Sequence, residues 1–229
     1  MLPKAATAVA RNTVFIVDDH PIVRQGLALL INREPDLAVC GDAEEAGSAL
    51  RRIEELKPDL IVVDISLNGP DGLDLLKDIR ARDTNLPVLI LSMLDESLYA
   101  ERALRAGANG YIMKQEATDR VLVAIRRILR GQIYVSDRMA NRMLHRFASG
   151  APVEQRSPVA DLTDRELEVF RLIGEGHGTR QIAQDLHLSV KTVESYQAHI
   201  KDKLSLKNAR ELLQRAVQWT VADKPAQSS

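Results

Sequence analysis

The chain has 229 residues, a formal net charge of −1 and one cysteine, Cys40. This length suits two domains of about 100 residues each, and the near-neutral charge gives no overall electrostatic signature of a partner. A single cysteine excludes an internal disulfide, and no apolar run approaches the roughly 18 residues that cross a membrane. We therefore expect a cytoplasmic protein without a membrane partner.

The two ends of the chain have the composition of unpacked segments. Residues 1–12 contain no apolar core long enough for a secretory signal, and residues 222–229 are mostly small and polar. We predict disordered tails over 1–12 and 222–229, with the folded domains between them.

Residues 13–131 alternate between short apolar runs and segments with helical periodicity. Each run is followed by apolar residues spaced three and four apart, as on one face of a helix, and Leu60–Val63 is also rich in β-branched residues. Five such pairs predict an α/β domain with a doubly wound, five-stranded parallel sheet and helices on both faces. The strand-like runs are Thr13–Val17, Leu37–Gly41, Leu60–Val63, Pro87–Leu91 and Asn109–Met113.

Carboxylates follow two of these runs at the point where each strand ends. Asp18 and Asp19 follow the first run, and Asp64 follows the third. Because parallel strands end at one edge of a sheet, the three side chains are expected to meet there. Clustered carboxylates repel one another unless a cation is shared, and oxygen ligands favour Mg²⁺. A carboxylate beside that metal can also attack a phosphoryl group and form an aspartyl phosphate.

Two further strand ends supply groups that neutralise phosphoryl oxygens. Ser92 follows the fourth run with a hydroxyl donor, and Lys114 follows the fifth with a positive charge. Taken singly, an aspartate after a strand is usually a turn residue and a lysine is usually at the surface. Their joint placement at successive strand ends favours a phosphoryl-accepting site.

The next segments predict a linker and a helical domain. Residues 132–157 combine a short amphipathic helix, which begins at Ser136-Asp137, with a proline-bearing stretch, so we predict a linker there. Residues 158–221 have helical periodicity throughout, with a capping box at Thr163 and Glu166 and a second cap at Ser189. The last helix is predicted to bury five apolar residues, which are Ala209, Leu212, Leu213, Ala216 and Val217.

The spacing of the middle helices predicts a helix-turn-helix, although a plain helical bundle fits the periodicity about as well. A short helix starts at Thr179, and a longer one, Val190 to Leu204, would lie in the major groove of DNA. Between Lys191 and Arg215 the chain has six basic and three acidic residues. A nucleic-acid face fits this local charge, although charge alone favours a solvated helix surface.

The strand-end residues resemble those of the receiver domain of two-component response regulators. The resemblance implies that Asp64 accepts phosphate from a sensor histidine kinase. It further implies that Asp19, Asp64 and the Ser66 carbonyl ligate Mg²⁺, while Asp18 holds a metal-bound water. Ser92 and Lys114 would hold the phosphoryl oxygens. Tyr111 would be the aromatic residue that moves inward as Ser92 is drawn to the phosphate. Asn68 stands where many receivers have proline, and Pro70 follows.

The helical region resembles the LuxR-type DNA-binding domain, and both domains in this order resemble a response regulator of the NarL/FixJ subfamily. The second resemblance rests on the run Leu162–Val169 together with Lys191-Thr192-Val193-Glu194. It implies base contacts on the exposed side of the longer helix and phosphate contacts near its ends. The DNA-contacting residues implied in this way are Thr179, Lys191, Thr192, Glu194, Ser195, Ala198, Lys201 and Lys203.

Three functions are compatible with parts of this pattern. A phosphorylation-controlled transcription regulator, which is not an enzyme and acts on double-stranded DNA as a homodimer, explains both motifs. A Mg²⁺-dependent phosphohydrolase would use Asp64 as a covalent nucleophile, but the chain has no evident substrate-binding cap. A signalling module that binds only protein would show no salt-dependent DNA affinity. In the last helix, Leu212, Leu213 and Val217 could join two DNA-binding domains or form an internal core.

Overall fold

The computed structural model describes residues 11–67, 72–148, 159, 162–186 and 188–223. Contacts divide the chain into two compact units, residues 1–149 and 150–229. This division falls inside the predicted linker of 132–157, whose limits stay a prediction. Asn68 and Pro70, which were singled out in the sequence, lie outside the described residues. Within the described ranges, no helix has both the length and the apolar character that crossing a membrane requires.

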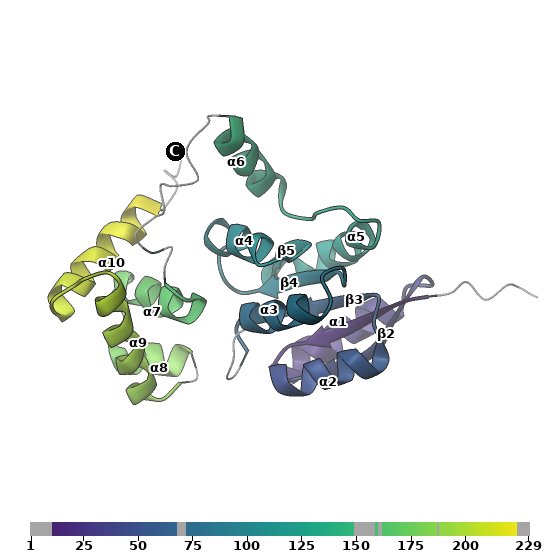
Figure 1. Cartoon of the computed structure of the whole chain (residues 1–229), viewed down its shortest axis with the longest axis horizontal. Coiled ribbons are helices and arrows are strands. Elements are labelled where there is room, and N and C mark those ends of the chain that lie inside the picture. The colour runs from purple at the N-terminus through teal and green to yellow at the C-terminus, as the bar shows by residue number, and fades with distance from the viewer. Residues whose placement is uncertain (1–10, 68–71, 149–158, 160–161, 187, 224–229) are drawn as a thin grey trace, which may run out of the picture. The chain divides into compact units, whose positions relative to one another are not determined.

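The first unit is built around a five-stranded parallel sheet with the strand order β2-β1-β3-β4-β5. Figure 1 shows the five strands side by side and flanked by helices, as predicted for a doubly wound α/β fold. The strands are β1 (Asn12–Val17), β2 (Leu37–Ala43), β3 (Leu60–Val63), β4 (Val88–Ser92) and β5 (Gly110–Met113). The helices are α1 (Pro21–Asn32), α2 (Ala46–Leu56), α3 (Gly72–Arg82), α4 (Glu96–Arg105), α5 (Ala117–Leu129) and α6 (Asp137–Ala148).

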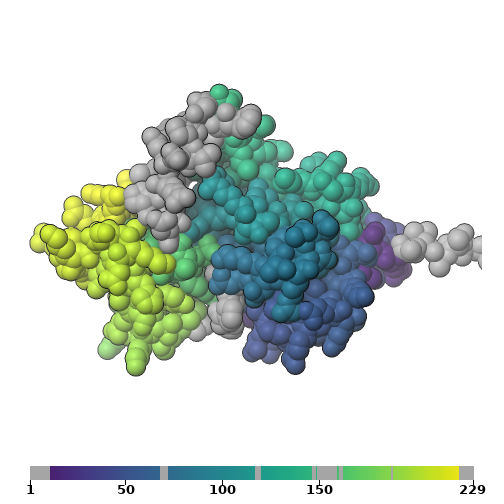
Figure 2. Space-filling view, viewed as in Figure 1, coloured from purple at the N-terminus to yellow at the C-terminus, as the bar shows by residue number. Residues whose placement is uncertain are grey.

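The two faces of the sheet follow from the alternation of side chains along each strand. Val14, Val62 and Leu89 point to one face, where they form a core with Leu27 of α1 and Ile125 of α5. The residues between them point to the opposite face, on the side of α2, α3 and α4. The space-filling view shows the side chains of these three helices closing over that side (Figure 2). Both faces are therefore covered, and only the strand ends can present polar groups.

Within residues 162–186 and 188–223, the second unit has four α-helices around a small core. They are α7 (Asp164–Gly174), α8 (Thr179–Asp185), α9 (Val190–Lys203) and α10 (Ala209–Asp223). The rings of Phe170 on α7 and Trp219 on α10 pack with their centroids 5.7 Å apart. Gly174 lets the two helices approach, because a Cβ there would lie 2.6 Å from the Ala216 carbonyl oxygen.

Two details of the second unit differ from the sequence expectation. Of the five residues predicted to be buried in α10, Leu212 and Ala216 are buried, whereas Leu213 and Val217 are 46% and 40% exposed, and Ala209 is exposed as well. The helix packs mainly on α7. The face that it buries is therefore narrower than the face that carries its apolar residues. The sequence also favours Thr179 as the N-cap of the short helix, but Gly178 is the N-cap of α8 and Thr179 is its first helical residue.

Candidate functional site

The register of the sheet brings the predicted residues to one edge. Val63, the last residue of β3, pairs with Val17 of β1 and with Ile90 of β4. Asp18 and Asp64 directly follow the paired residues Val17 and Val63. They therefore lie next to each other at the ends of the adjacent strands β1 and β3. The Asp64 amide donates to the Val17 carbonyl at 2.8 Å, which extends the ladder to the acid itself.

Ser92 and Lys114 reach the same edge from the other side of Asp64. Ser92 is the last residue of β4 and pairs with Met113 of β5, which directly precedes Lys114. The side chains of Asp18, Asp64, Ser92 and Lys114 are almost completely buried. The structure therefore gathers the strand-end residues in one polar cluster beneath the surface.

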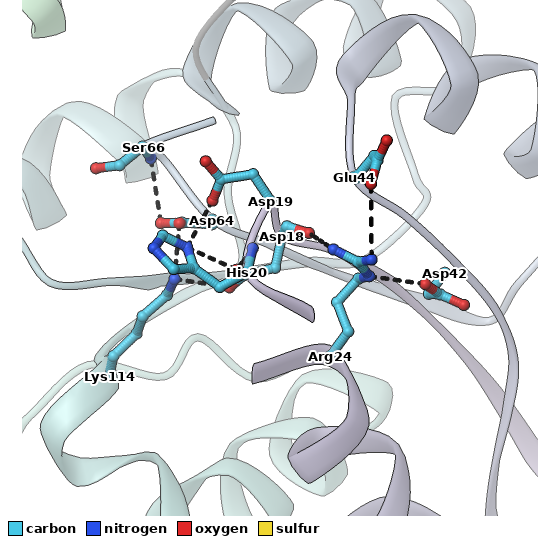
Figure 3. Close-up of polar contacts among 9 residues, drawn as sticks. All are labelled: Asp18, Asp19, His20, Arg24, Asp42, Glu44, Asp64, Ser66 and Lys114. Carbon is cyan, nitrogen blue, oxygen red and sulfur yellow. Dashed lines mark hydrogen bonds and ion pairs between the residues drawn. The ribbon is translucent and has the colours of Figure 1, made fainter. Parts of the chain in front are cut away.

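Lys114 links the two buried aspartates directly. Its ammonium nitrogen lies 2.7 Å from an oxygen of Asp18 and 2.7 Å from an oxygen of Asp64 (Figure 3). Burial lowers the pKa of Lys114, but the two carboxylates raise it further, and the net pKa lies above its ordinary value. Lys114 is thus a fixed positive charge beside Asp64.

Asp64 is held at both oxygens. Oδ2 accepts from Lys114 at 2.7 Å, and Oδ1 accepts from the Ser66 amide at 3.1 Å. Burial raises the pKa of Asp64 above its ordinary value, and the charge of Lys114 opposes this rise without cancelling it. The environment therefore disfavours the ionised acid, and any added cation or donor next to it is stabilising.

A fourth residue, His20, belongs to the acidic cluster and was missed by sequence reasoning. Ligand atoms of Asp18, Asp19, His20 and Asp64 all lie within 4.8 Å of one another. The His20 amide donates to Asp18 at 2.9 Å, and its Nδ1 lies 2.6 Å from an Asp19 oxygen. Its position immediately after Asp18-Asp19, in the turn before α1, was the available signal.

The donor set of this cluster fits a hard divalent cation. Three carboxylates converge on one region, while Lys114 is the single ammonium that touches them among the described residues. Receiver domains typically bind Mg²⁺ in such an acidic pocket, and carboxylate oxygens are the ligands that this ion prefers. The residues present are therefore suited to the metal that the sequence predicts.

Ser92 and Tyr111 form a second polar contact next to the cluster. The Ser92 hydroxyl accepts from the Leu94 amide at 3.2 Å, and the Tyr111 hydroxyl donates to the Leu94 carbonyl at 2.8 Å. The Tyr111 side chain is fully buried, and burial strongly raises its pKa although a hydrogen bond with Ser92 lowers it. The ring thus occupies the inward position that the resemblance associates with phosphorylation.

The second unit presents the predicted DNA-contacting residues mainly on α9. Ser189 caps this helix by accepting from the Thr192 amide at 3.1 Å, as its sequence position predicted. Lys191, Glu194, Ser195 and Ala198 are exposed. Thr179 lies on α8, where its hydroxyl accepts from Gln197 of α9 at 3.2 Å.

Lys203, near the end of α9, has a partner that sequence reasoning missed. Its ammonium nitrogen lies 2.6 Å from Glu166 of α7. Glu166 also accepts from the Thr163 amide at 2.7 Å, which completes the predicted capping box. Burial raises the pKa of Glu166, but Lys203 and Thr163 outweigh it, and the net pKa is below its ordinary value. Lys203 therefore helps to join α7 to α9.

The fold and the site define a two-component response regulator. Residues 14–126 match the response regulator receiver domain, and residues 160–216 match the luxR family of bacterial regulatory proteins. The chain belongs to this family of transcription regulators, which are not enzymes.

Its relatives include the oxygen regulatory protein NreC of Staphylococcus haemolyticus, which is 35% identical over 92% of this chain and 99% of the relative. A LuxR-family response regulator of Aurantimonas sp. SI85-9A1 is 37% identical, with a TM-score of 0.57 over 61% of this chain and 99% of that chain. RcsB of Salmonella enterica serovar Typhimurium, solved on promoter DNA with the phosphomimetic BeF3−, is 26% identical, with a TM-score of 0.57 over 90% of this chain and 98% of that one.

Proposed function

We propose that phosphorylation of Asp64 by a sensor histidine kinase controls sequence-specific DNA binding by the second unit. One observation carries the proposal: Lys114 lies 2.7 Å from both Asp18 and Asp64 at the end of adjacent strands. A buried lysine on the acceptor carboxylate supplies the charge that a bound phosphoryl group needs. Because the target is DNA, we place this function in the cytoplasm.

Asp18, Asp19, Asp64 and the Ser66 carbonyl would hold Mg²⁺ at this site. When bound, the ion neutralises charge on the phosphoryl oxygens during transfer. An Asp64 carboxylate oxygen attacks the phosphorus of the donor phosphohistidine, a P–O bond forms, and the P–N bond to the donor breaks. Ser92 then donates its hydroxyl to a phosphoryl oxygen, and Lys114 turns from the carboxylates toward another.

The output of the switch would be DNA binding by α9. Exposed Lys191 lies in the first turn of the helix, where a cation and backbone amides together favour phosphate oxygens. Thr192, Lys201 and Lys203 are proposed as further phosphate contacts, and Glu194, Ser195 and Ala198 as base contacts. The relative RcsB has been solved bound to promoter DNA, which supports DNA binding as the output.

We further propose that the protein binds DNA as a homodimer. Leu213, Val217 and Val221 are exposed and spaced four residues apart on α10, so they form one apolar stripe. Such a stripe on a helix end fits contact between two copies, whereas Leu212 and Ala216 serve the internal core. RcsB, whose fold this chain shares, has been solved as dimers bound to DNA.

Labelling with radioactive acetyl phosphate tests the acceptor. We expect wild type to take up about one phosphoryl group slowly, because the chemistry is stoichiometric rather than catalytic. Asp64→Asn should take up none, whereas Asp78→Asn, which changes an exposed acid on α3, should label like wild type. Label that persists on Asp64→Asn would refute the assignment.

Selection of DNA from a random pool tests the output. Acetyl-phosphate-treated wild type should enrich a paired half-site sequence, with an affinity that falls steeply as salt rises. Asp64→Asn should enrich it weakly or not at all. Absence of any salt-dependent DNA affinity would favour the alternative of a module that binds only protein.

A further inference from the structure

Arg24 of α1 reaches across to the backbone of the acidic loop, residues 18–20 between β1 and α1. Its Nη1 donates to the Asp18 carbonyl at 2.6 Å, and its Nε donates to Asp42 at 2.8 Å. Glu44 lies farther away, with 3.8 Å between its Oε2 and the Arg24 Nη2. Figure 3 shows the guanidinium between the acidic loop on one side and Asp42 and Glu44 on the other. The side chain is only 14% exposed.

The Asp18 carbonyl is the point at which the chain leaves the sheet. The Asp18 amide still bonds to the Ala43 carbonyl at 3.1 Å, and α1 begins at Pro21. The peptide plane that contains this carbonyl also contains the Cα atoms of Asp18 and Asp19. Fixing the carbonyl therefore restrains the two Cα atoms from which both carboxylate side chains start.

The side-chain partners of Arg24 lie outside the acidic cluster and hold its guanidinium in place. Asp42 lies at the end of β2 and is paired in the sheet with Ile16 of β1. The Asp42 and Glu44 side chains are 51% and 64% exposed and lie outside the acidic cluster. The guanidinium thus ties the loop to an element that the sheet already holds in register.

We propose that Arg24 is a positioning residue for the phosphoacceptor site, which holds the Asp18-Asp19 peptide so that both carboxylates face the divalent cation. The inference rests on the proposed function of that site. Arg24 would touch neither the cation nor the phosphoryl group. Its loss should therefore weaken metal binding through disorder of the loop.

The direction in which cation affinity changes on loss of Arg24 distinguishes a positioning role from a purely electrostatic role. A positive charge near an acidic cluster repels a cation, so by Coulomb's law its removal should strengthen metal binding. Loss of a positioning contact should weaken binding instead. The two hypotheses also predict different affinities for Arg24→Lys. If Arg24 acts by positioning, Arg24→Lys keeps one donor and binds the cation more tightly than Arg24→Gln. If Arg24 acts only through its charge, Arg24→Lys binds the cation more weakly than Arg24→Gln.

Binding of Mn²⁺ to the full-length protein, measured by the electron paramagnetic resonance of the free ion, tests the proposal without phosphorylation. We expect Arg24→Gln to weaken Mn²⁺ binding on the order of fivefold, the scale of one lost hydrogen bond, with Arg24→Lys between it and wild type. Arg52→Gln is the matched control, because Arg52 donates to the Asp42 carbonyl and lies over the Phe15 ring, and it contacts no described residue of the acidic cluster. It should bind Mn²⁺ like wild type.

The role of Arg24 is tested on folded variants. Circular dichroism establishes that each variant is folded at the temperature of the titration. Unchanged or tighter Mn²⁺ binding by folded Arg24→Gln, or weaker binding by Arg24→Lys than by Arg24→Gln, would overturn the role of Arg24. If Arg24→Gln does not fold, Asp42→Asn removes the 2.8 Å partner of Arg24 and should weaken Mn²⁺ binding more than Glu44→Gln, which removes an equal charge but only a 3.8 Å contact. Equal weakening by these two variants would overturn the role of Arg24. A wild type that neither binds Mn²⁺ nor labels on Asp64 would overturn the proposed function itself.

Discussion

Glu96 accepts hydrogen bonds from both donors of Ser136. Its Oε1 accepts from the Ser136 amide at 2.8 Å, and its Oε2 accepts from the Ser136 hydroxyl. Glu96 is the first residue of α4, whereas Ser136 precedes α6 and caps it by accepting from the Met139 amide at 3.1 Å. The start of α6 is thus fixed to the start of α4, two residues after Leu94, which contacts both Ser92 and Tyr111.

Glu96→Ala should loosen α6. The substitution removes two acceptors and leaves the Ser136 cap without its support, which we expect to cost about 1 to 2 kcal/mol locally. Amide hydrogen exchange of residues 140–145 should therefore become about tenfold faster. Arg105→Ala, which breaks an ion pair with Glu101 within α4, serves as the control and should leave these amides unchanged. Unaltered protection in Glu96→Ala would mean that other contacts hold α6.

The segment that leads into α6 is also joined to the sheet, through Tyr134. The Tyr111 amide donates to the Tyr134 carbonyl at 2.9 Å, and the Tyr134 amide donates to the Asn109 carbonyl at 3.0 Å. Residue 134 thereby pairs with the edge of β5. A movement of Tyr111 or of the loop at Leu94 would therefore be transmitted to both ends of the segment that leads into α6.

The strand ends could be predicted because two local rules combine there. A β-branched run predicts a strand, and the carboxyl ends of parallel strands lie at one edge, so Asp64 and Lys114 were expected at the same edge of the sheet. The contacts of Arg24 and Glu96 could not be predicted, because each joins side chains from separate elements at angles that periodicity does not determine. Periodicity also gives the direction of an apolar face but not its width, which is why Leu213 and Val217 were wrongly assigned to the core.

Gly72→Ala should damage the site through the backbone of Asp64. A Cβ on Gly72 would lie 1.9 Å from the Asp64 carbonyl oxygen, so α3 or the strand end has to move. We expect a loss of about 2 kcal/mol in the free energy of unfolding, as for overpacked cores. Gly47→Ala in α2 is the control, since a Cβ there meets nothing within 4 Å, and it should stabilise the protein by about 0.5 to 1 kcal/mol. Urea unfolding of both variants measures the difference, and equal effects would contradict the close approach.

Asp64→Asn should stabilise the metal-free protein at neutral pH. Burial raises the folded-state pKa of Asp64 above the ordinary 3.8, so the folded protein binds this proton more tightly than the unfolded chain does. The free energy of unfolding therefore falls as pH rises from about 4 through the raised pKa. The asparagine variant lacks this loss, so in EDTA it should exceed wild type at pH 7 and match it below about pH 4. Greater stability of wild type at pH 7 would show that Lys114 outweighs burial.

Lys191 and Lys203 were both implied as phosphate contacts, but the structure gives them different surroundings. Lys191 is exposed in the first turn of α9, whereas Lys203 is paired with Glu166 at 2.6 Å. Lys191→Ala should lower the slope of log affinity against log salt by about 0.9, the value for one phosphate contact. Its free energy of unfolding should stay near that of wild type, because exposed substitutions away from special features change it by about 0.5 kcal/mol or less.

Lys203→Ala should show the opposite pattern. Glu166 is 4% exposed and loses its cation, so we expect a lower free energy of unfolding for the DNA-binding unit and a smaller change in the salt slope. Fluorescence of Trp219, the single tryptophan of the chain, reports unfolding of this unit, and filter binding at several salt concentrations gives the slope. A slope reduced by about 0.9 in Lys203→Ala would show that this lysine exchanges Glu166 for a DNA phosphate on binding.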